Sequence, residues 1–243
     1  MTLPKVFVGT MYCGEGDFPR CKESIKSQQG VDVSHVIVEN MPEKQAHNAL
    51  WALWRAANDG GFAAFVKVDA DTVLAGDNVL ATIVDVFRSS PRVTGIQSPL
   101  LDYFTAGFIN GLNAFAPCVT FNDTVDDIYC DRNVDVGHDL IVSSDQVPPV
   151  LRPAGFHCYA ATPLQAYHFG VHRALKNQTA TLAAVKRAWS KEGGDKRAYA
   201  LLGAADSSSI GRQCSYGDQR LLIAFDATKR RFDQRVNELR ATL

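Results

Sequence analysis

Phe65-Val66-Lys67-Val68-Asp69-Ala70-Asp71-Thr72 is the stretch that decides the fold, because a short hydrophobic run leads directly into two aspartates. The run before Asp69 is rich in β-branched and aromatic residues, which indicates a buried strand. Carboxylates on alternate residues of an extended segment point the same way, so both would reach one cation. Carboxylate oxygens suit Mg²⁺ or Mn²⁺, ions that bridge the phosphates of bound nucleotides. A plainer interpretation also stands, in which Asp71 caps the next helix and Asp69 bonds the loop backbone.

Strands and helices alternate on both sides of this stretch. The expected strands are 5–10, 33–39, 64–68 and 93–97, and the expected helices are 17–29, 42–57 and 77–88. Strands separated by helices of this length imply right-handed crossovers and a mainly parallel sheet. Ligands bind at the carboxyl ends of such strands, which is where we expect Thr10, Glu39 and Asp69.

The pattern changes after residue 98. Gly, Pro and Asn-Asp pairs break residues 99–160 into short apolar runs, which favours mixed or antiparallel strands with functional loops. From Pro163 onward we expect helices over 163–176, 179–191 and about 221–239, with Gly193-Gly194 and Ser207-Ser208-Ser209 as loops. The predicted class is α/β, with a mainly parallel sheet flanked by helices, a mixed-sheet second half and a helical C-terminus.

The composition is that of an ordinary globular protein. The 243 residues are 46% hydrophobic and 21% charged, and the formal net charge of −1 argues against a nucleic-acid binder. No run of residues is long and apolar enough to predict a signal sequence or a transmembrane helix, so the expected location is cytoplasmic. The six cysteines lack metal-binding spacing and are expected to be buried free thiols.

In the order of these features the sequence resembles the GT-A glycosyltransferases, in particular the nucleotide-sugar-dependent, family 2-like enzymes that carry an Asp-x-Asp motif. The matching parts are Val6-Phe7-Val8-Gly9-Thr10, Glu39, Lys44-Gln45-Ala46-His47-Asn48 and Val68-Asp69-Ala70-Asp71. The resemblance implies a Rossmann-like GT-A domain over 1–176, with a nucleotide-sugar half (1–98) and an acceptor half (99–176). Residues 177–243 would form a helical extension packed on it, whose role, peripheral membrane contact included, is left open.

The resemblance also implies an activity. A sugar would pass from a nucleoside diphosphate donor, UDP- or GDP-linked, to a hydroxyl of a glycan or another acceptor, with Mn²⁺ or Mg²⁺ as cofactor. By analogy Thr10 would contact the nucleoside, Glu39 the base or ribose, and Asp69 the ribose or metal. Asp71 would ligate the metal. Members of the family more often carry Asp at the position of Glu39, which also fits a plain solvated carboxylate at a strand end.

Further donor and metal contacts are expected from helices and from a late strand. GT-A enzymes often take another metal ligand from a strand after the acceptor region, and His157 is the best match. Lys44 and Asn48 lie one helical turn apart and would face the donor, or else form an exposed helix face. Arg173 and Lys176 share a helix face and would reach the donor pyrophosphate, with ordinary helix packing as the competing interpretation.

The densest acidic cluster lies at residues 123–131. Transfer with inversion needs a carboxylate that takes the proton of the acceptor hydroxyl, and inverting GT-A enzymes place it in this part of the chain. Asp127 or Asp126 is the match, with Asp131 third, although the usual Glu-Asp pair is absent. A polar loop with Asx turns explains the same residues, and a retaining enzyme would need no such base.

Other classes of protein remain open at this point. A haloacid-dehalogenase-like phosphatase also places Asp-x-Asp after a hydrophobic strand, but normally after the first strand of the fold. A nucleotidyltransferase would need a Gly-rich phosphate loop, which Gly9 to Gly16 imitates poorly. A non-catalytic module that binds nucleotide sugars would keep the donor intact.

Overall fold

The computed structural model of the protein describes residues 2–131, 134–137, 139–143, 145–211 and 215–241. It forms two compact units, one made of Met1–Asp102 with Phe108–Ala160 and one made of Tyr103–Gly107 with Ala161–Leu243. The α/β class predicted from the sequence is confirmed. The boundary expected between residues 176 and 177 falls one helix later than the boundary between these units.

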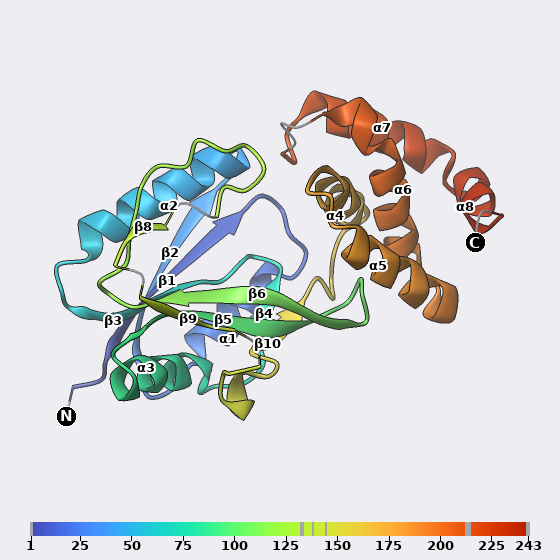
Figure 1. Ribbon diagram of the computed structural model, residues 1–243. Coiled ribbons are helices and arrows are strands. Elements are labelled where there is room, and N and C mark those ends of the chain that lie inside the picture. Colours follow the sequence, from blue (N-terminus) through green and yellow to red (C-terminus); the bar gives the residue numbers. More distant parts are fainter. Residues whose placement is uncertain (1, 132–133, 138, 144, 212–214, 242–243) are drawn as a thin grey trace. The chain divides into compact units, whose positions relative to one another are not determined.

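The first unit is built on a mixed sheet in the order β2-β1-β3-β6-β5-β10-β4, with β9 also paired to β5 (Figure 1). Its strands are β1 (Lys5–Tyr12), β2 (Asp32–Glu39), β3 (Phe62–Lys67), β4 (Thr72–Leu74), β5 (Val93–Asp102), β6 (Gly107–Phe115), β9 (Leu140–Val142) and β10 (Gly155–His157). β1 is parallel to β2 and to β3, while β6 and β4 are antiparallel to their neighbours β3 and β10. The short strands β7 (Thr120–Phe121) and β8 (Val134–Val136) form a separate antiparallel pair.

Helices cover both faces of this sheet, as Figure 1 shows. The helices α1 (Phe18–Lys26) and α3 (Val79–Ser89) pack on one face, near the 3₁₀ turn Pro149–Leu151, and α2 (Glu43–Ala57) packs on the other. Trp51 and Trp54 of α2 are fully buried, whereas Leu53 between them is 42% exposed. Two residues along a helix turn the side chain by roughly 200°, so Leu53 points away from the stripe that Trp51 begins.

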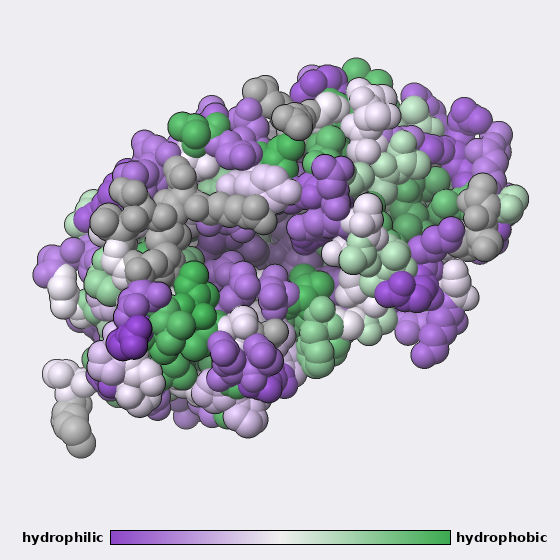
Figure 2. Space-filling model, in the orientation of Figure 1, coloured by the Kyte–Doolittle hydropathy of each residue, from purple (hydrophilic) through white to green (hydrophobic). Residues whose placement is uncertain are grey.

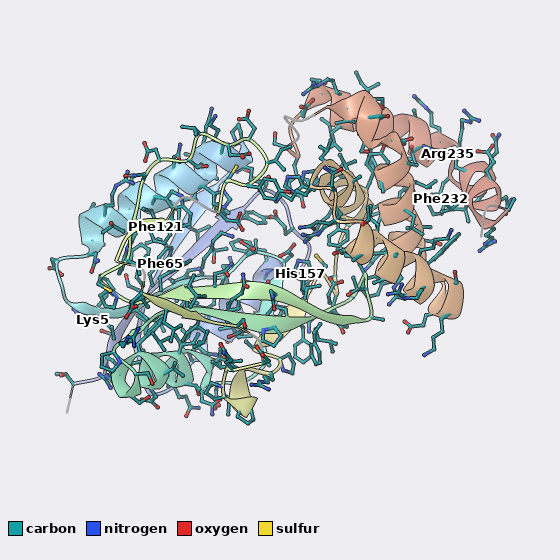
Figure 3. All side chains as sticks on the ribbon, in the orientation of Figure 1. Lys5, Phe65, Phe121, His157, Phe232 and Arg235 are labelled. Carbon is teal, nitrogen blue, oxygen red and sulfur yellow. The ribbon has the colours of Figure 1, made fainter. Side chains whose placement is uncertain are left out.

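Aromatic rings fill the space under α2. The rings of Trp51 and Phe121 are stacked with centroids 4.2 Å apart, and Phe65 lies edge-on to Phe121 at 5.7 Å (Figure 3). Phe7 contacts Phe65 at 5.5 Å, so strands β1, β3 and β7 meet in one cluster. Tilted and edge-to-face arrangements at these distances are the favoured geometries of aromatic pairs. This cluster anchors the segment that follows β7 against α2.

The second unit is helical, with α4 (Pro163–Leu175), α5 (Thr179–Glu192), α6 (Asp195–Ile210), α7 (Gln219–Arg230) and α8 (Phe232–Arg240). Ser207-Ser208-Ser209, expected as a loop, lies inside α6, and the helix expected over 221–239 is two helices that part at Arg231. Serine has only a modest helix propensity, and tertiary packing overrides it here. The packing is unusually close, because a Cβ on Gly170 would lie 1.7 Å from the carbonyl oxygen of Ala200.

One partly buried polar network joins four helices of this unit, α4, α6, α7 and α8. Asp206 of α6 accepts hydrogen bonds from the Tyr167 hydroxyl at 2.6 Å, from the Thr228 hydroxyl at 3.0 Å and from Arg235. These bonds hold the pKa of Asp206 below its ordinary value although burial opposes this. A half-buried carboxylate with a cationic partner and two hydroxyl donors is well satisfied, so we interpret this network as structural.

Figure 2 shows hydrophilic side chains interspersed with hydrophobic ones over the helices of the second unit. Among the described residues, no helix combines the length and the apolar character needed to cross a bilayer. Cys13, Cys21, Cys118, Cys130 and Cys158 are free thiols as expected, although Cys118 is exposed; Cys214 lies outside the described residues.

Candidate functional site

Three parallel strands end side by side at one edge of the sheet. The register pairs Tyr12, the last residue of β1, with Glu39, the last residue of β2, and the amide of Val68 donates to the carbonyl of Gly9 at 3.0 Å. Glu39 is exposed at this edge, as the sequence predicted for a strand end. Thr10 lies two residues before the end of β1, fully buried, with its hydroxyl 2.9 Å from Nε2 of His35.

The Asp-x-Asp segment forms a turn at this edge and is not extended. The amide of Thr72 donates to the carbonyl of Asp69 at 2.8 Å, so the argument from alternation along an extended segment does not apply to these two carboxylates. Asp69 forms a short ion pair with Lys67, whose side chain is buried. Burial opposes the charge on Lys67, but Asp69 and then Asp131 outweigh it and raise the lysine's pKa. The Lys67 ammonium therefore balances the Asp69 carboxylate.

Asp71 lies beside the end of β10, where the side chains of His157 and Cys158 contact its carboxylate. Because β10 runs antiparallel to β4, His157 is opposite Thr72, and the amide of Cys158 donates to the carbonyl of Asp71 at 2.9 Å. Nε2 of His157 lies 3.4 Å from Oδ2 of Asp71, and Sγ of Cys158 lies 3.1 Å from the same oxygen. The ligand atoms of these three residues all fall within 4.8 Å of one another. The structure thus brings together two of the three predicted metal ligands and adds Cys158, while Asp69 is held by Lys67.

A buried carboxylate fixes the orientation of the His157 ring. β10 is parallel to β5, and the register places Asp102 directly beside His157. Oδ1 of the fully buried Asp102 accepts a hydrogen bond from Nδ1 of His157 at 2.7 Å, which leaves Nε2 directed toward Asp71. A carboxylate behind the other ring nitrogen is the usual support of a metal-binding histidine. Sequence reasoning missed Asp102 because it ended this strand at residue 97, although an aspartate at the true strand end was visible in the sequence.

The backbone is strained beside this histidine. Cys158 has φ of +62°, the left-handed region that a side chain with a Cβ rarely adopts. The next turn is held by Asp17, whose Oδ2 accepts a hydrogen bond from the amide of Ala160 at 2.7 Å. Asp17 begins α1 as predicted, yet its side chain makes no capping bond to that helix. It instead positions the segment that carries His157, and strain held in place by such contacts is common at functional sites.

The electrostatics of the site favour a cation. Burial, and then the charge of Asp71, raise the pKa of Glu15 to about 7, and the same two causes raise the pKa of the Cys21 thiol. Burial disfavours a charge on His157, but its acidic neighbours outweigh this and raise its pKa; burial, and then Asp71, raise the pKa of the Cys158 thiol. A carboxylate whose pKa is raised by burial beside another carboxylate is a feature of sites that bind a cation. Glu15, in the loop after β1, was also missed by sequence reasoning.

The acidic loop after β7 lies along α2. Lys44 donates to Asp127 at 3.1 Å and to the carbonyl of Val125 at 2.8 Å, while Asn48 exchanges hydrogen bonds with the backbone of Thr124. Lys44 and Asn48 share one face of α2, and their side chains hydrogen-bond this loop. The contact of these two residues with the nucleotide sugar stays a prediction.

The three candidate bases of the loop differ in their surroundings. Oδ1 of Asp126 accepts hydrogen bonds from the backbone amides of Ile128 at 2.7 Å and Tyr129 at 3.0 Å. This is the Asx turn that the sequence offered as an alternative interpretation of the loop. Asp127 is paired with Lys44, and Asp131 acts electrostatically on Lys67. Among the three, Asp131 is therefore the one linked to the Asp69 ion pair.

Arg173 and Lys176, the predicted pyrophosphate contacts, belong to the second unit at the end of α4. Arg173 donates to Oε1 of Gln178 at 2.8 Å, and its guanidinium lies 4.7 Å from the centroid of the Phe169 ring. These contacts fit the helix-packing interpretation considered for this face, and the pyrophosphate contact stays a prediction.

No protein-family model matches this sequence, and no curated protein matches it. Solved structures do match. One is a glycosyltransferase involved in the glycosylation of the major capsid of PBCV-1, with 12% identity and a TM-score of 0.33 over 46% of this chain; the match spans 60% of that chain's length. Another is the mannosyltransferase PcManGT from Pyrobaculum calidifontis in complex with GDP-Man and Mn²⁺, with 15% identity and a TM-score of 0.37 over 94% of this chain and 87% of that one. The chain is thus similar to glycosyltransferases of known structure, at TM-scores that by themselves assign it no activity.

Proposed function

We propose that this protein is a metal-dependent glycosyltransferase that uses a nucleoside diphosphate sugar. The observation that carries the proposal is the Asp102–His157 pair, which directs an imidazole nitrogen at the second aspartate of an Asp-x-Asp turn. That turn follows the end of β3, next to β1 and β2, and ligands of α/β sheets bind at this edge. The resemblance noted from the sequence implies the same chemistry for the same residues.

Asp71 and His157 would hold the metal, with the Cys158 thiol as a neighbour. One carboxylate and one imidazole form a donor set that favours a transition-metal ion such as Mn²⁺ over Mg²⁺, which prefers oxygen ligands alone. When bound, the ion would supply positive charge that stabilises the leaving diphosphate. Asp102 would hold the proton on Nδ1 of His157 and aim Nε2 at the metal, which would take the place of a proton on that nitrogen. Lys67 would orient Asp69 toward the donor ribose or the metal.

We assign the acceptor-side base to the acidic loop and favour Asp131. Asp131 acts electrostatically on Lys67, the lysine that pairs with Asp69, so among the three aspartates it is the one linked to the Asp-x-Asp turn. A carboxylate there would take the proton of the acceptor hydroxyl while the sugar bond forms, giving inversion. The anomeric configuration of the product, read by NMR, separates this from retention.

The test is a calorimetric and thermal-shift screen of UDP, GDP, CDP and their sugars, each with Mn²⁺ or with EDTA. We expect one diphosphate to stabilise the protein only when Mn²⁺ is present, since a ligand stabilises the state that binds it. Asp71→Asn should abolish that shift, while Asp85→Asn, the same change at an exposed position of α3, should leave it intact. A nucleotide-induced thermal shift of the same size in EDTA and in the Asp71→Asn variant would overturn the metal assignment. Metal-dependent binding without sugar transfer or hydrolysis would point to a non-catalytic binding module.

A further inference from the structure

A second group of metal-ligating side chains lies on the α2 side of the sheet. Glu43 and His47 are one turn apart in the first half of α2, and Cys130 comes from the acidic loop. One ligand atom from each residue falls within 4.8 Å of the other two. His47 is 2% exposed and Cys130 is fully buried. None of these residues belongs to the Asp71–His157–Cys158 group.

The two nitrogens of the His47 ring have different surroundings. Nδ1 lies 2.9 Å from the backbone carbonyl of Glu43, and because a carbonyl only accepts, this nitrogen carries the proton. Nε2 is buried, with no hydrogen-bond partner within the described parts of the chain. With the proton on Nδ1, Nε2 of the neutral ring carries a buried lone pair that no donor among the described residues meets. A buried acceptor left unsatisfied destabilises the fold, and a bound cation would remove that cost.

We propose that Glu43, His47 and Cys130 form a second metal site, selective for Zn²⁺ or a similar transition-metal ion, with water as the fourth ligand. Carboxylate, imidazole and thiolate are the three ligand types that Zn²⁺ takes in proteins, and the backbone bond to Nδ1 is the support such a histidine usually has. The thiol of Cys130 donates to the carbonyl of Asp126 at 3.1 Å. On binding, its proton passes to solvent and the thiolate joins the metal.

The surrounding charges allow a cation at this place. The positive charge of Lys67 disfavours a positive charge on His47, and the negative charges of Glu43 and Asp69 favour one there. Asp69 already pairs with Lys67, and Asp131 adds a further negative charge beside that lysine. Glu43 and the Cys130 thiolate would neutralise the charge of a divalent ion within the site itself.

Such an ion would fasten the acidic loop to α2. Hydrogen bonds from Lys44 and Asn48 already hold residues 124–127 along this helix, and the proposed site lies at the N-terminal end of the helix. A metal bound through Cys130 would hold this part of the loop in place, and with it the neighbouring Asp131. The proposal concerns a structural ion and does not depend on the function proposed for the Asp71–His157 site.

The test is a Co²⁺ titration of the full-length Asp71→Asn protein, in which the other site is disabled. A thiolate ligand gives cobalt a charge-transfer absorption in the near ultraviolet, and we expect saturable growth of this band with one equivalent of metal. Adding Cys130→Ser or Glu43→Gln should remove the band or weaken binding at least tenfold, since each removes one ligand. Cys118→Ser, which changes an exposed thiol, is the matched control and should bind as before.

Two outcomes would overturn the proposal: a band that persists in the Cys130→Ser variant, or one that disappears with Cys158→Ser instead. Glu43 is only partly buried, so Glu43→Gln keeps the test valid if the buried cysteine variant fails to fold. Circular dichroism of each metal-free variant checks its fold before titration.

Discussion

Asp102 is the residue on which the orientation of His157 depends most directly, since its carboxylate accepts the Nδ1–H at 2.7 Å. We predict that Asp102→Asn lowers Mn²⁺ affinity about 10- to 100-fold, the usual effect of removing a carboxylate behind a histidine ligand. Isothermal titration of Mn²⁺ measures the change, with Asp85→Asn as the control. Unchanged affinity in a folded Asp102→Asn protein would show that this carboxylate does not support the metal site.

Glu15 is expected to make stability depend on pH. Its pKa is raised to about 7 by burial and by Asp71, so between about pH 4.5 and 7 the folded protein binds more protons than the unfolded chain. The stabilising preference for the protonated form is present below that window and is lost as pH rises through 7. Glu15→Gln, whose side-chain oxygen still accepts from the Cys13 amide, should therefore match wild type at pH 4 and exceed it by roughly 2 kcal/mol at pH 8.

Urea unfolding of both proteins across this pH range, in EDTA, tests the sign. A Glu15→Gln protein that parallels wild type at every pH would mean that the pKa of Glu15 is the same in the folded and the unfolded protein. Added Mn²⁺ should shrink the difference, because a nearby cation favours the charged carboxylate.

Among single residues, those that belong to a local sequence motif or match a family resemblance were predictable from the sequence. Asp71 and His157 were predicted from a strand end and from a resemblance, and the structure brings them together. Asp102, Cys158 and Glu15 were missed, because their roles arise from pairing between β4, β5 and β10 and from burial. Register between strands far apart in the chain leaves no local signal in the sequence.

Two glycines decide how closely α4 and α6 approach. A Cβ on Gly170 would meet the backbone of Ala200, and one on Gly203 would lie 2.1 Å from the carbonyl oxygen of Tyr167. We predict that Gly203→Ala destabilises the protein by about 1–3 kcal/mol, since two backbones must separate. Gly217→Ala is the control, because no atom lies within 4 Å of its added Cβ. Thermal unfolding compares the two variants, and equal melting temperatures would contradict the prediction.

Elements were predictable where the pattern was local and strong. The parallel strands β1, β2 and β3 and the helix α2 follow from runs of β-branched residues and from the spacing of the tryptophans. Helix α6 was missed because its amphipathic pattern is weak and three serines suggested a loop. Its stability comes from Gly203 against α4 and from Asp206 bonded to Tyr167 and Arg235, and such contacts become visible only in three dimensions.

At the scale of the whole molecule, the proposed Asp71 metal site lies within one unit. Mn²⁺ should therefore slow hydrogen exchange of amides near residues 69–74, 100–102 and 155–158, whose strands pair with one another. The helices α5 to α8 should exchange at the same rate with Mn²⁺ as with EDTA. Hydrogen exchange read by mass spectrometry resolves these segments, and equal protection of both units would argue against a metal confined to the first.

The short segment Tyr103–Gly107 belongs with the C-terminal helices although it joins β5 to β6 of the sheet. Arg197 of α6 donates to the carbonyls of Tyr103 and Phe104, and the ring of Phe104 is stacked on Phe169 of α4 at 4.3 Å. A chimaera with another protein could not exchange the helical part by a single crossover after Ala160. It would have to carry the connection between β5 and β6 together with residues 161–243, because these two segments pack as one unit.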